Sequence, residues 1–241
     1  MAIVKPFKAV RPSRDKVALV SSKSYDAYTD KELDAKLEFN PFSFLHIINP
    51  GYKYHQEFTG EQRFQMIHNR YEEFKENKIF IKDSSDSFYI YESSDTHNSF
   101  CGIIAATAVD DYSNGYIKKH EGTIKKREKL FENYLKATGF NAEPVLLTYE
   151  DDENFNKLLQ TLKEKRPEYE FSTTDKKLHR LWLIDDEINI EKITSFFEKK
   201  EALYIADGHH RSESSSLLKK ALQKENNHHN GTENYNYFMS Y

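Results

Sequence analysis

The sequence predicts an α+β fold with mixed sheets, hairpins and crossover helices. Pairs of short apolar runs with strand-like alternation are separated by polar turns, as in residues 87–92 and 98–110. Amphipathic segments of helical period, such as residues 61–78, lie between other strands. No period repeats along the 241 residues, which argues against a solenoid. This mixture of hairpins and crossover helices is typical of the α+β class.

The elements follow from local signals along the chain. Residues 4–20 are expected to be extended around a turn at Arg11-Pro12-Ser13, and Thr29 with Glu32 forms a capping box for the first helix. Asn40-Pro41 ends that helix, and Gly139 ends the charged helix. The expected helices are residues 32–37, 61–78, 118–138, 153–165, 190–200 and 213–222. The expected strands are residues 44–48, 87–92, 98–110, 145–149, 169–173, 177–184, 203–206 and 235–241.

Composition limits the classes of function. Charged residues make up 31% of the chain and the net charge is −4, so nothing points to a nucleic-acid partner. The longest apolar run, residues 101–109, is too short to span a bilayer, and no signal-peptide pattern is present. Cys101 is the only cysteine, which excludes an intramolecular disulfide and favours a reducing compartment. We therefore expect a cytoplasmic protein without membrane partners, in which Cys101 is buried and inert.

The chain divides into two expected regions. Residues 1–97 form an N-terminal α+β region, and residues 98–241 carry the motifs described below. The aromatic strand 235–241 begins and then stops, so we expect a truncated chain whose last strand has an unpaired apolar edge.

The most informative segment is Asp207-Gly208-His209-His210-Arg211-Ser212, which links an apolar strand to a helix-forming run. A glycine at a strand–helix junction allows a ligand to approach the backbone closely, and the helix start offers free N–H groups. Two imidazoles and a guanidinium add donors and positive charge. Although Asp-Gly is also a common turn dipeptide, the combination predicts a phosphate-binding turn.

A second candidate is His120-Glu121-Gly122-Thr123, at the start of the charged helix 118–138. A glutamate at a helix start is often only favourable to the helix dipole. Glu121 also follows Gly115 and a break in the helical pattern. The alternative interpretation is therefore that Glu121 belongs to a functional site.

The two motifs, in this order, resemble those of the domain-of-unknown-function family 1015. The block Asn40-Pro41-Phe42-Ser43-Phe44-Leu45-His46 also resembles an early block of that family, so the resemblance covers nearly the whole chain. The family's early Pro-Tyr-Asp is here Ser24-Tyr25-Asp26, without the proline. Family members are typically longer, which agrees with the expected truncation. We therefore expect part of the family's usual site or dimer surface to be missing, and a homodimer remains an open alternative.

The same motifs resemble those of archaeal free-serine kinases, which have the ParB/sulfiredoxin fold. The resemblance implies a ParB/sulfiredoxin-like core. It also implies phosphoryl transfer from ADP, ATP or pyrophosphate to a small hydroxyl compound, of which free L-serine is the leading candidate. It implies Glu121 as the base and residues 207–211 as the phosphate turn. The full set of candidate residues is catalytic Glu121, Asp207 and His120, phosphate- or nucleotide-binding Gly208, His209, His210, Arg211, Ser212 and Thr123, and substrate-binding Tyr25 and Asp26.

The chemistry needs charge neutralisation more than covalent help. Asp207 is expected to orient a histidine or to hold Mg²⁺ through water. A zinc site is disfavoured, because adjacent histidines seldom reach one ion and no third nitrogen or sulfur ligand stands out. Sulfinic-acid reduction is disfavoured because a histidine stands where sulfiredoxin has its cysteine. One alternative function is a nucleotide-binding regulator without catalysis. A second is a ParB-like nucleic-acid partner, which the negative net charge of the chain disfavours.

Overall fold

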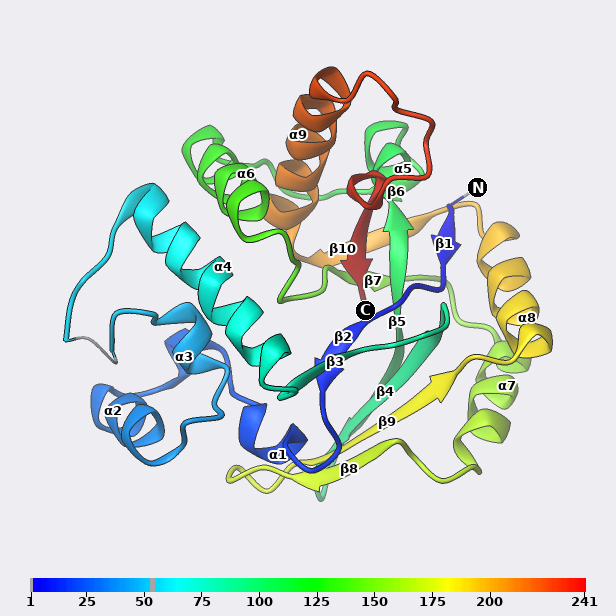
Figure 1. The fold of residues 1–241 in the computed structure, drawn as a ribbon. Coiled ribbons are helices and arrows are strands. Elements are labelled where there is room, and N and C mark those ends of the chain that lie inside the picture. Colours follow the sequence, from blue (N-terminus) through cyan, green and yellow to red (C-terminus); the bar gives the residue numbers. More distant parts are fainter. Residues whose placement is uncertain (1, 53–54) are drawn as a thin grey trace.

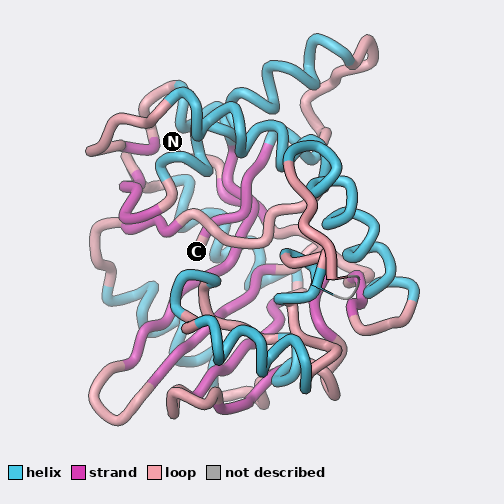
Figure 2. Tube along the Cα trace, turned by 90° about the vertical axis from the view of Figure 1, so that its left-hand side faces the viewer, coloured by secondary structure: helices cyan, strands magenta, loops and turns pink. Residues whose placement is uncertain are grey.

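A computed structural model describes residues 2–52 and 55–241 as a mixed α+β fold, in which strands run through the centre and helices lie at the periphery (Figures 1 and 2). The strands are β1 (Val4–Lys5), β2 (Val10–Pro12), β3 (Phe80–Lys82), β4 (Phe88–Ser94), β5 (Ser99–Ala108), β6 (Ile117–Lys118), β7 (Leu146–Thr148), β8 (Tyr169–Ser172), β9 (Leu178–Ile184), β10 (Leu203–Asp207) and β11 (Tyr237–Ser240). The helices are α1 (Val17–Val20), α2 (Asp30–Phe39), α3 (Leu45–Ile48), α4 (Gly60–Glu76), α5 (Val109–Ser113), α6 (Lys125–Thr138), α7 (Glu153–Lys163), α8 (Glu187–Glu198) and α9 (His209–Glu225). The α+β prediction is thus confirmed.

The largest sheet has the order β1-β5-β4-β9-β8, with β11 added to β5. Its two hairpins, β4–β5 and β8–β9, are antiparallel and confirm the two hairpins predicted from the sequence. The expected boundary between residues 97 and 98 lies in the turn of the first hairpin, whose two strands pair over six residue pairs. The division into two regions stays a prediction.

Two hydrophobic clusters hold the helices in place. In the larger, Phe155 of α7 and Ile193 and Phe197 of α8 pack on the sheet side chains Ile90 and Trp182, and both helices lie together at the right of Figure 1. The smaller joins α4 to its neighbours through aromatic rings (Phe64, Phe74, Phe80, Tyr71, Tyr134 and Phe140). In the described part of the chain, no helix combines the length and apolarity that crossing a bilayer requires.

Strand β11 connects two sheets. One edge pairs antiparallel with residues 105–108 of β5. On the other side the backbone of Val145 bonds with Met239 and Tyr241, and Leu147 N–H donates to the Tyr241 carbonyl. The expectation of an unpaired edge on residues 235–241 is therefore wrong. Residues 145–147 lead into β7, which belongs to the three-stranded sheet β6-β10-β7.

Several local predictions were wrong. The expected strand 44–48 is wrong: its residues form helix α3 (Leu45–Ile48) and the N-cap Phe44, because Ser43 Oγ accepts from Leu45 N–H and the backbone closes successive turns from Asn40 onward. Residues 17–20 are also helical rather than extended. The charged helix begins at Lys125 and not at residue 118, because β6 pairs with β10 up to Lys118. Cys101 is exposed on β5 and not buried.

The last residue packs closely on β5. Tyr241 Oη donates to the carbonyl of Tyr91, and a Cβ on Gly102 would lie 2.6 Å from the Tyr241 ring. We expect Gly102→Ala to destabilise the fold by about 1–3 kcal/mol, the usual cost of forcing an extra carbon into a packed contact. Urea unfolding would measure this loss. Gly122→Ala is the control, because nothing lies within 4 Å of a Cβ there. Equal stability of the two variants would contradict the contact.

Candidate functional site

The junction between β10 and α9 is built around Gly208. Its φ of 99° and ψ of 27° lie in the left-handed region, which glycine adopts without steric cost. A Cβ at this position would lie 3.3 Å from Val145 Cα and 3.3 Å from Arg211 Cζ. Gly208 therefore lets the chain turn sharply from strand to helix while the segment before β7 packs against it.

Arg211 holds this turn together. Its Nη2 donates to Asp207 Oδ2 at 2.7 Å, and its Nη1 donates to the carbonyl of Pro144. The carboxylate of Glu143 lies 3.7 Å from Nη2. The guanidinium thus links both sides of the junction to the segment before β7. Because a guanidinium has five N–H donors, these contacts still leave donors for a ligand.

The first turn of α9 has no local acceptor for its backbone N–H groups. Gly208 supplies no side-chain cap, and no acidic residue occurs in the first turn. The first intrahelical bond runs from Ser212 N–H to the Gly208 carbonyl, which leaves the N–H groups of residues 209–211 outside the helical ladder. Ser212 is buried, and its Oγ also lies 3.3 Å from the Gly208 carbonyl oxygen. The positive end of a 17-residue helix therefore favours an anion here.

The two sequence motifs meet at this helix start. Strands β6 and β10 pair in parallel, with Leu203 opposite Ile117 and Tyr204 opposite Lys118. Since parallel strands end at the same edge of a sheet, the residues that follow each strand come out side by side. His120-Glu121-Gly122-Thr123 accordingly lies in the loop between β6 and α6, and not in the helix.

The contact between the motifs is made by His209. Its Nδ1 lies 3.8 Å from Glu121 Oε2, and its ring meets the His120 ring edge to face with centroids 4.5 Å apart. The Glu121 side chain is 67% exposed and that of His120 is 60% exposed, while His209 is only 6% exposed. Burial, reinforced by the neighbouring His120, lowers the pKa of His209 below its usual 6.5, which favours the neutral ring. The structure thus brings together a buried imidazole and an accessible carboxylate.

Two imidazole nitrogens at this helix start are unsatisfied. Among the described residues, His209 Nε2 and His210 Nδ1 are buried and have no hydrogen-bond partner. Leaving a buried polar group without a partner costs about 1–3 kcal/mol. A structure retains such groups mainly where a ligand or an ordered water can satisfy them.

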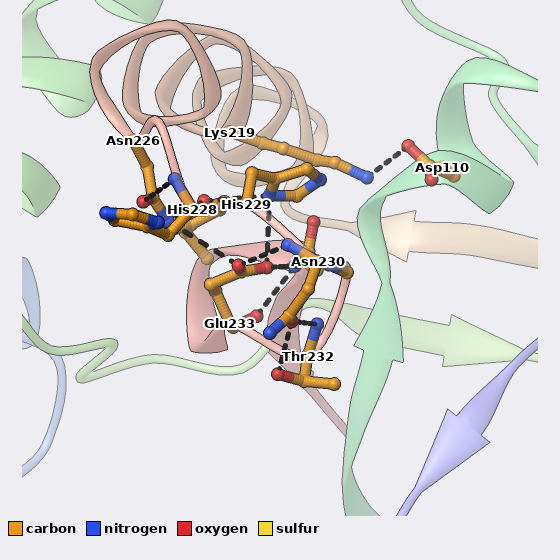
Figure 3. A network of polar contacts seen from close by, with 11 residues as sticks. Asp110, Lys219, Asn226, His228, His229, Asn230, Thr232 and Glu233 are labelled. Carbon is orange, nitrogen blue, oxygen red and sulfur yellow. Dashed lines mark hydrogen bonds and ion pairs between the residues drawn. The ribbon is translucent and has the colours of Figure 1, made fainter.

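The opposite end of α9 contrasts with this start (Figure 3). There Glu233 accepts from the backbone N–H groups of Asn230 and Gly231 and from Asn236 Nδ2, and His229 Nδ1 lies 3.0 Å from Glu233 Oε2. Although burial raises the pKa of Glu233, these hydrogen bonds and the nearby His229 lower it to about 2. One amide oxygen nearby, Asn236 Oδ1, has no partner among the described residues. The saturated carboxylate indicates that this loop network is structural.

A set of cations beside the site was not predicted from the sequence. Three exposed basic side chains occupy the first turn of α6 (Lys125, Lys126 and Arg127). Ser214 Oγ, in the second turn of α9, donates to the carbonyl of Glu128, so the first turn of α6 lies beside the N-terminal part of α9. Cations at a helix start are electrostatically unfavourable, which is offset when an anion binds there. The run Lys-Lys-Arg was the available signal in the sequence.

A further contact ties the loop before α6 to α9. Tyr112 Oη donates to Glu213 Oε2 at 2.7 Å, and Lys119 Nζ lies 4.2 Å from the Tyr112 ring centroid. Thr123 is half-buried in the same loop. In the described residues, no group of three or more histidine, cysteine or acidic side chains is arranged to hold a metal ion.

The predicted substrate-binding pair lies elsewhere. Tyr25 is exposed in a short 3-10 helix, Tyr25–Ala27, between α1 and α2. Figure 1 shows α1 and α2 at the lower left and α9 at the top. The side chain of Asp26 lies outside the described residues. The Asn40 block has structural contacts instead: Asn40 Nδ2 donates to the Leu19 carbonyl, and His46 Nε2 lies 3.1 Å from the Asn40 carbonyl oxygen.

Comparison with known proteins gives one match. A family model described as "protein of unknown function (DUF1015)" matches residues 4–241. No curated protein and no solved structure matches the chain significantly.

The conformation of Gly208 can be tested directly. We expect Gly208→Ala to destabilise the protein by about 1–3 kcal/mol, because the new Cβ meets Val145 and the positive φ is strained. Gly115→Ala is the matched control, since Gly115 has a φ of 77° but nothing within 4 Å of its Cβ position. Chemical denaturation of both variants separates backbone strain from crowding. A Gly208 variant no less stable than the Gly115 variant would exclude the close approach of Val145.

Proposed function

The chain belongs to the DUF1015 family, and we propose that it is a phosphotransferase that moves a phosphoryl group from a phosphate donor to the hydroxyl of a small metabolite, with free L-serine as the leading acceptor. One observation carries this proposal. The uncapped start of α9 places a buried imidazole, His209, 3.8 Å from an accessible carboxylate, Glu121. An anion site and a carboxylate base side by side are what transfer to a hydroxyl needs.

The anion side rests on converging positive charge. Free N–H groups and the helix dipole of α9 favour a phosphate at its first turn. The basic first turn of α6 contacts α9 through Ser214 and adds long-range attraction. Arg211 shapes the turn through Asp207 and keeps further donors for phosphate oxygens. In this proposal the residues that hold the donor are Gly208, His209, His210, Arg211 and Ser212, with Thr123 from the neighbouring loop.

The acceptor side rests on Glu121. Its exposed carboxylate belongs to a loop and makes only long contacts, 3.9 Å to His120 and 3.8 Å to His209. An accessible carboxylate can take the proton of an acceptor hydroxyl while the new P–O bond forms. In this proposal His120, whose side chain is 60% exposed in the same loop, contacts the acceptor. No contact in the described residues links Tyr25 to this side, so its proposed role in binding the acceptor needs a separate test.

Mg²⁺ bound to the phosphate groups of the donor fits this chemistry. Mg²⁺ keeps several waters and binds phosphate oxygens with one or two carboxylates. Asp207 is the carboxylate at the turn, and one of its oxygens accepts from Arg211. When bound, Mg²⁺ neutralises donor charge.

The direct test offers the protein L-serine with pyrophosphate, ADP or ATP in turn, each with Mg²⁺. We expect O-phosphoserine from at least one donor, because the donor site and the base are adjacent. Mass spectrometry of the product measures it, and reactions without protein or without serine are the controls. Donor binding without any phosphorylated product would instead support a nucleotide-binding regulator. Absence of both binding and product would refute the proposal.

The role of Glu121 gives a second prediction. We expect Glu121→Gln to lower turnover by about 10²–10⁴-fold, the usual worth of general-base catalysis, while donor affinity changes little. Glu201→Gln is the control, because Glu201 is an exposed acid in the loop before β10. Steady-state rates and calorimetry with the donor measure both effects. Full activity of the Glu121 variant would remove this residue from the mechanism.

A further inference from the structure

The geometry of His209 sets it apart from a simple phosphate ligand. One ring nitrogen, Nδ1, faces the Glu121 carboxylate at 3.8 Å, and the other, Nε2, has no partner among the described residues. At 3.8 Å the carboxylate is beyond hydrogen-bond distance, but its negative charge on the Nδ1 side favours the tautomer with the proton on Nδ1, which leaves a lone pair on Nε2. His209 is also the first residue of α9, where the helix start favours a phosphate.

We propose that His209 is the nucleophile of a two-step transfer and carries the phosphoryl group on Nε2. This proposal rests on the proposed phosphotransferase function. Histidine is one of the side chains that form covalent intermediates, and an adjacent carboxylate is a common activating partner. The proposed phosphotransferase could also act by direct transfer from donor to acceptor. The covalent route differs from it by a phosphohistidine intermediate on His209.

In the first step, the Nε2 lone pair attacks the terminal phosphorus of the donor. A P–N bond forms, and the P–O bond to the leaving group breaks. The leaving group keeps that electron pair and departs as phosphate from pyrophosphate, or as a nucleotide with one phosphate fewer. The developing positive charge on the ring is stabilised by Glu121, 3.8 Å from Nδ1.

In the second step, the acceptor hydroxyl oxygen attacks the phosphorus. The P–N bond breaks and its electron pair returns to Nε2, while the hydroxyl proton passes to Glu121. The same carboxylate thus orients the ring first and accepts the proton afterwards. Its high exposure is consistent with contact to an incoming acceptor.

The burial of His209 fits a protected intermediate. At 6% exposure, the ring is largely shielded from water, which would otherwise hydrolyse the P–N bond. The His120 ring packs edge to face on it and belongs to the loop between β6 and α6.

The test uses radiolabelled donors without any acceptor. Pyrophosphate, ADP and ATP, each labelled in the terminal phosphate, should leave up to one phosphate per chain. That label should survive alkali, be lost in mild acid, map to His209 by mass spectrometry and move to serine on its addition. The protein should also exchange labelled phosphate into pyrophosphate, or labelled AMP into ADP, with no acceptor present.

Variants keep the test decisive. His209→Gln should lose the label and the exchange, whereas His97→Gln, in the exposed β4–β5 turn, should keep both. Two results together would overturn the intermediate but leave the proposed function standing. The wild type would form phosphoserine without label or exchange, and His209→Gln would keep turnover within tenfold of the wild type. Absence of label, exchange and phosphoserine with every donor would overturn both.

Discussion

The candidate site depends on a short stretch of parallel pairing between β6 and β10. Only two residue pairs define it, but it places residues 120–121 and 207–209 at the same sheet edge although about 90 positions separate them in sequence. Two contacts of the adjoining helix α9 support this arrangement: Glu213 accepts from Tyr112 of α5, and Ser214 donates to the carbonyl of Glu128 in α6. Strand β11 then joins this small sheet to the large one through β5 and Val145.

The site combines rigid and adjustable parts. Gly208, Asp207 and Arg211 fix the turn, because positive φ, an ion pair and the Pro144 carbonyl all constrain it. Glu121 and His120 belong to an exposed loop with only long contacts to the turn. This combination of a fixed turn and an adjustable loop supports the proposed phosphotransferase, which must hold a charged donor while a second substrate enters.

Local signals in the sequence predicted much of the fold. The hairpin predicted for residues 87–92 and 98–110 is present as β4 and β5, although residues 109–110 begin α5, and the capping box at Thr29 and Glu32 is present, because each depends on near neighbours in the chain. Residues 44–48 were misassigned, since a short buried apolar run has no distinctive period and Ser43 closes a helical turn there. The Asp207–Ser212 turn was placed correctly at a strand–helix junction, but the contact of Glu121 with His209 depends on parallel pairing that no local pattern shows.

The long crossover from β6 to β10 has a consequence for how the protein responds to ligands. The turn, the Glu121 loop and the Pro144 segment come from three distant stretches of chain, so the complete site exists only when the whole tertiary structure has formed. A ligand that bridges them binds the native state and has no comparable partner in the denatured ensemble. By mass action, ligand at 100 times its dissociation constant would raise the global unfolding free energy by about 2.7 kcal/mol. Shifts in melting temperature across a panel of phosphorylated metabolites would therefore identify natural ligands without any assay of the reaction.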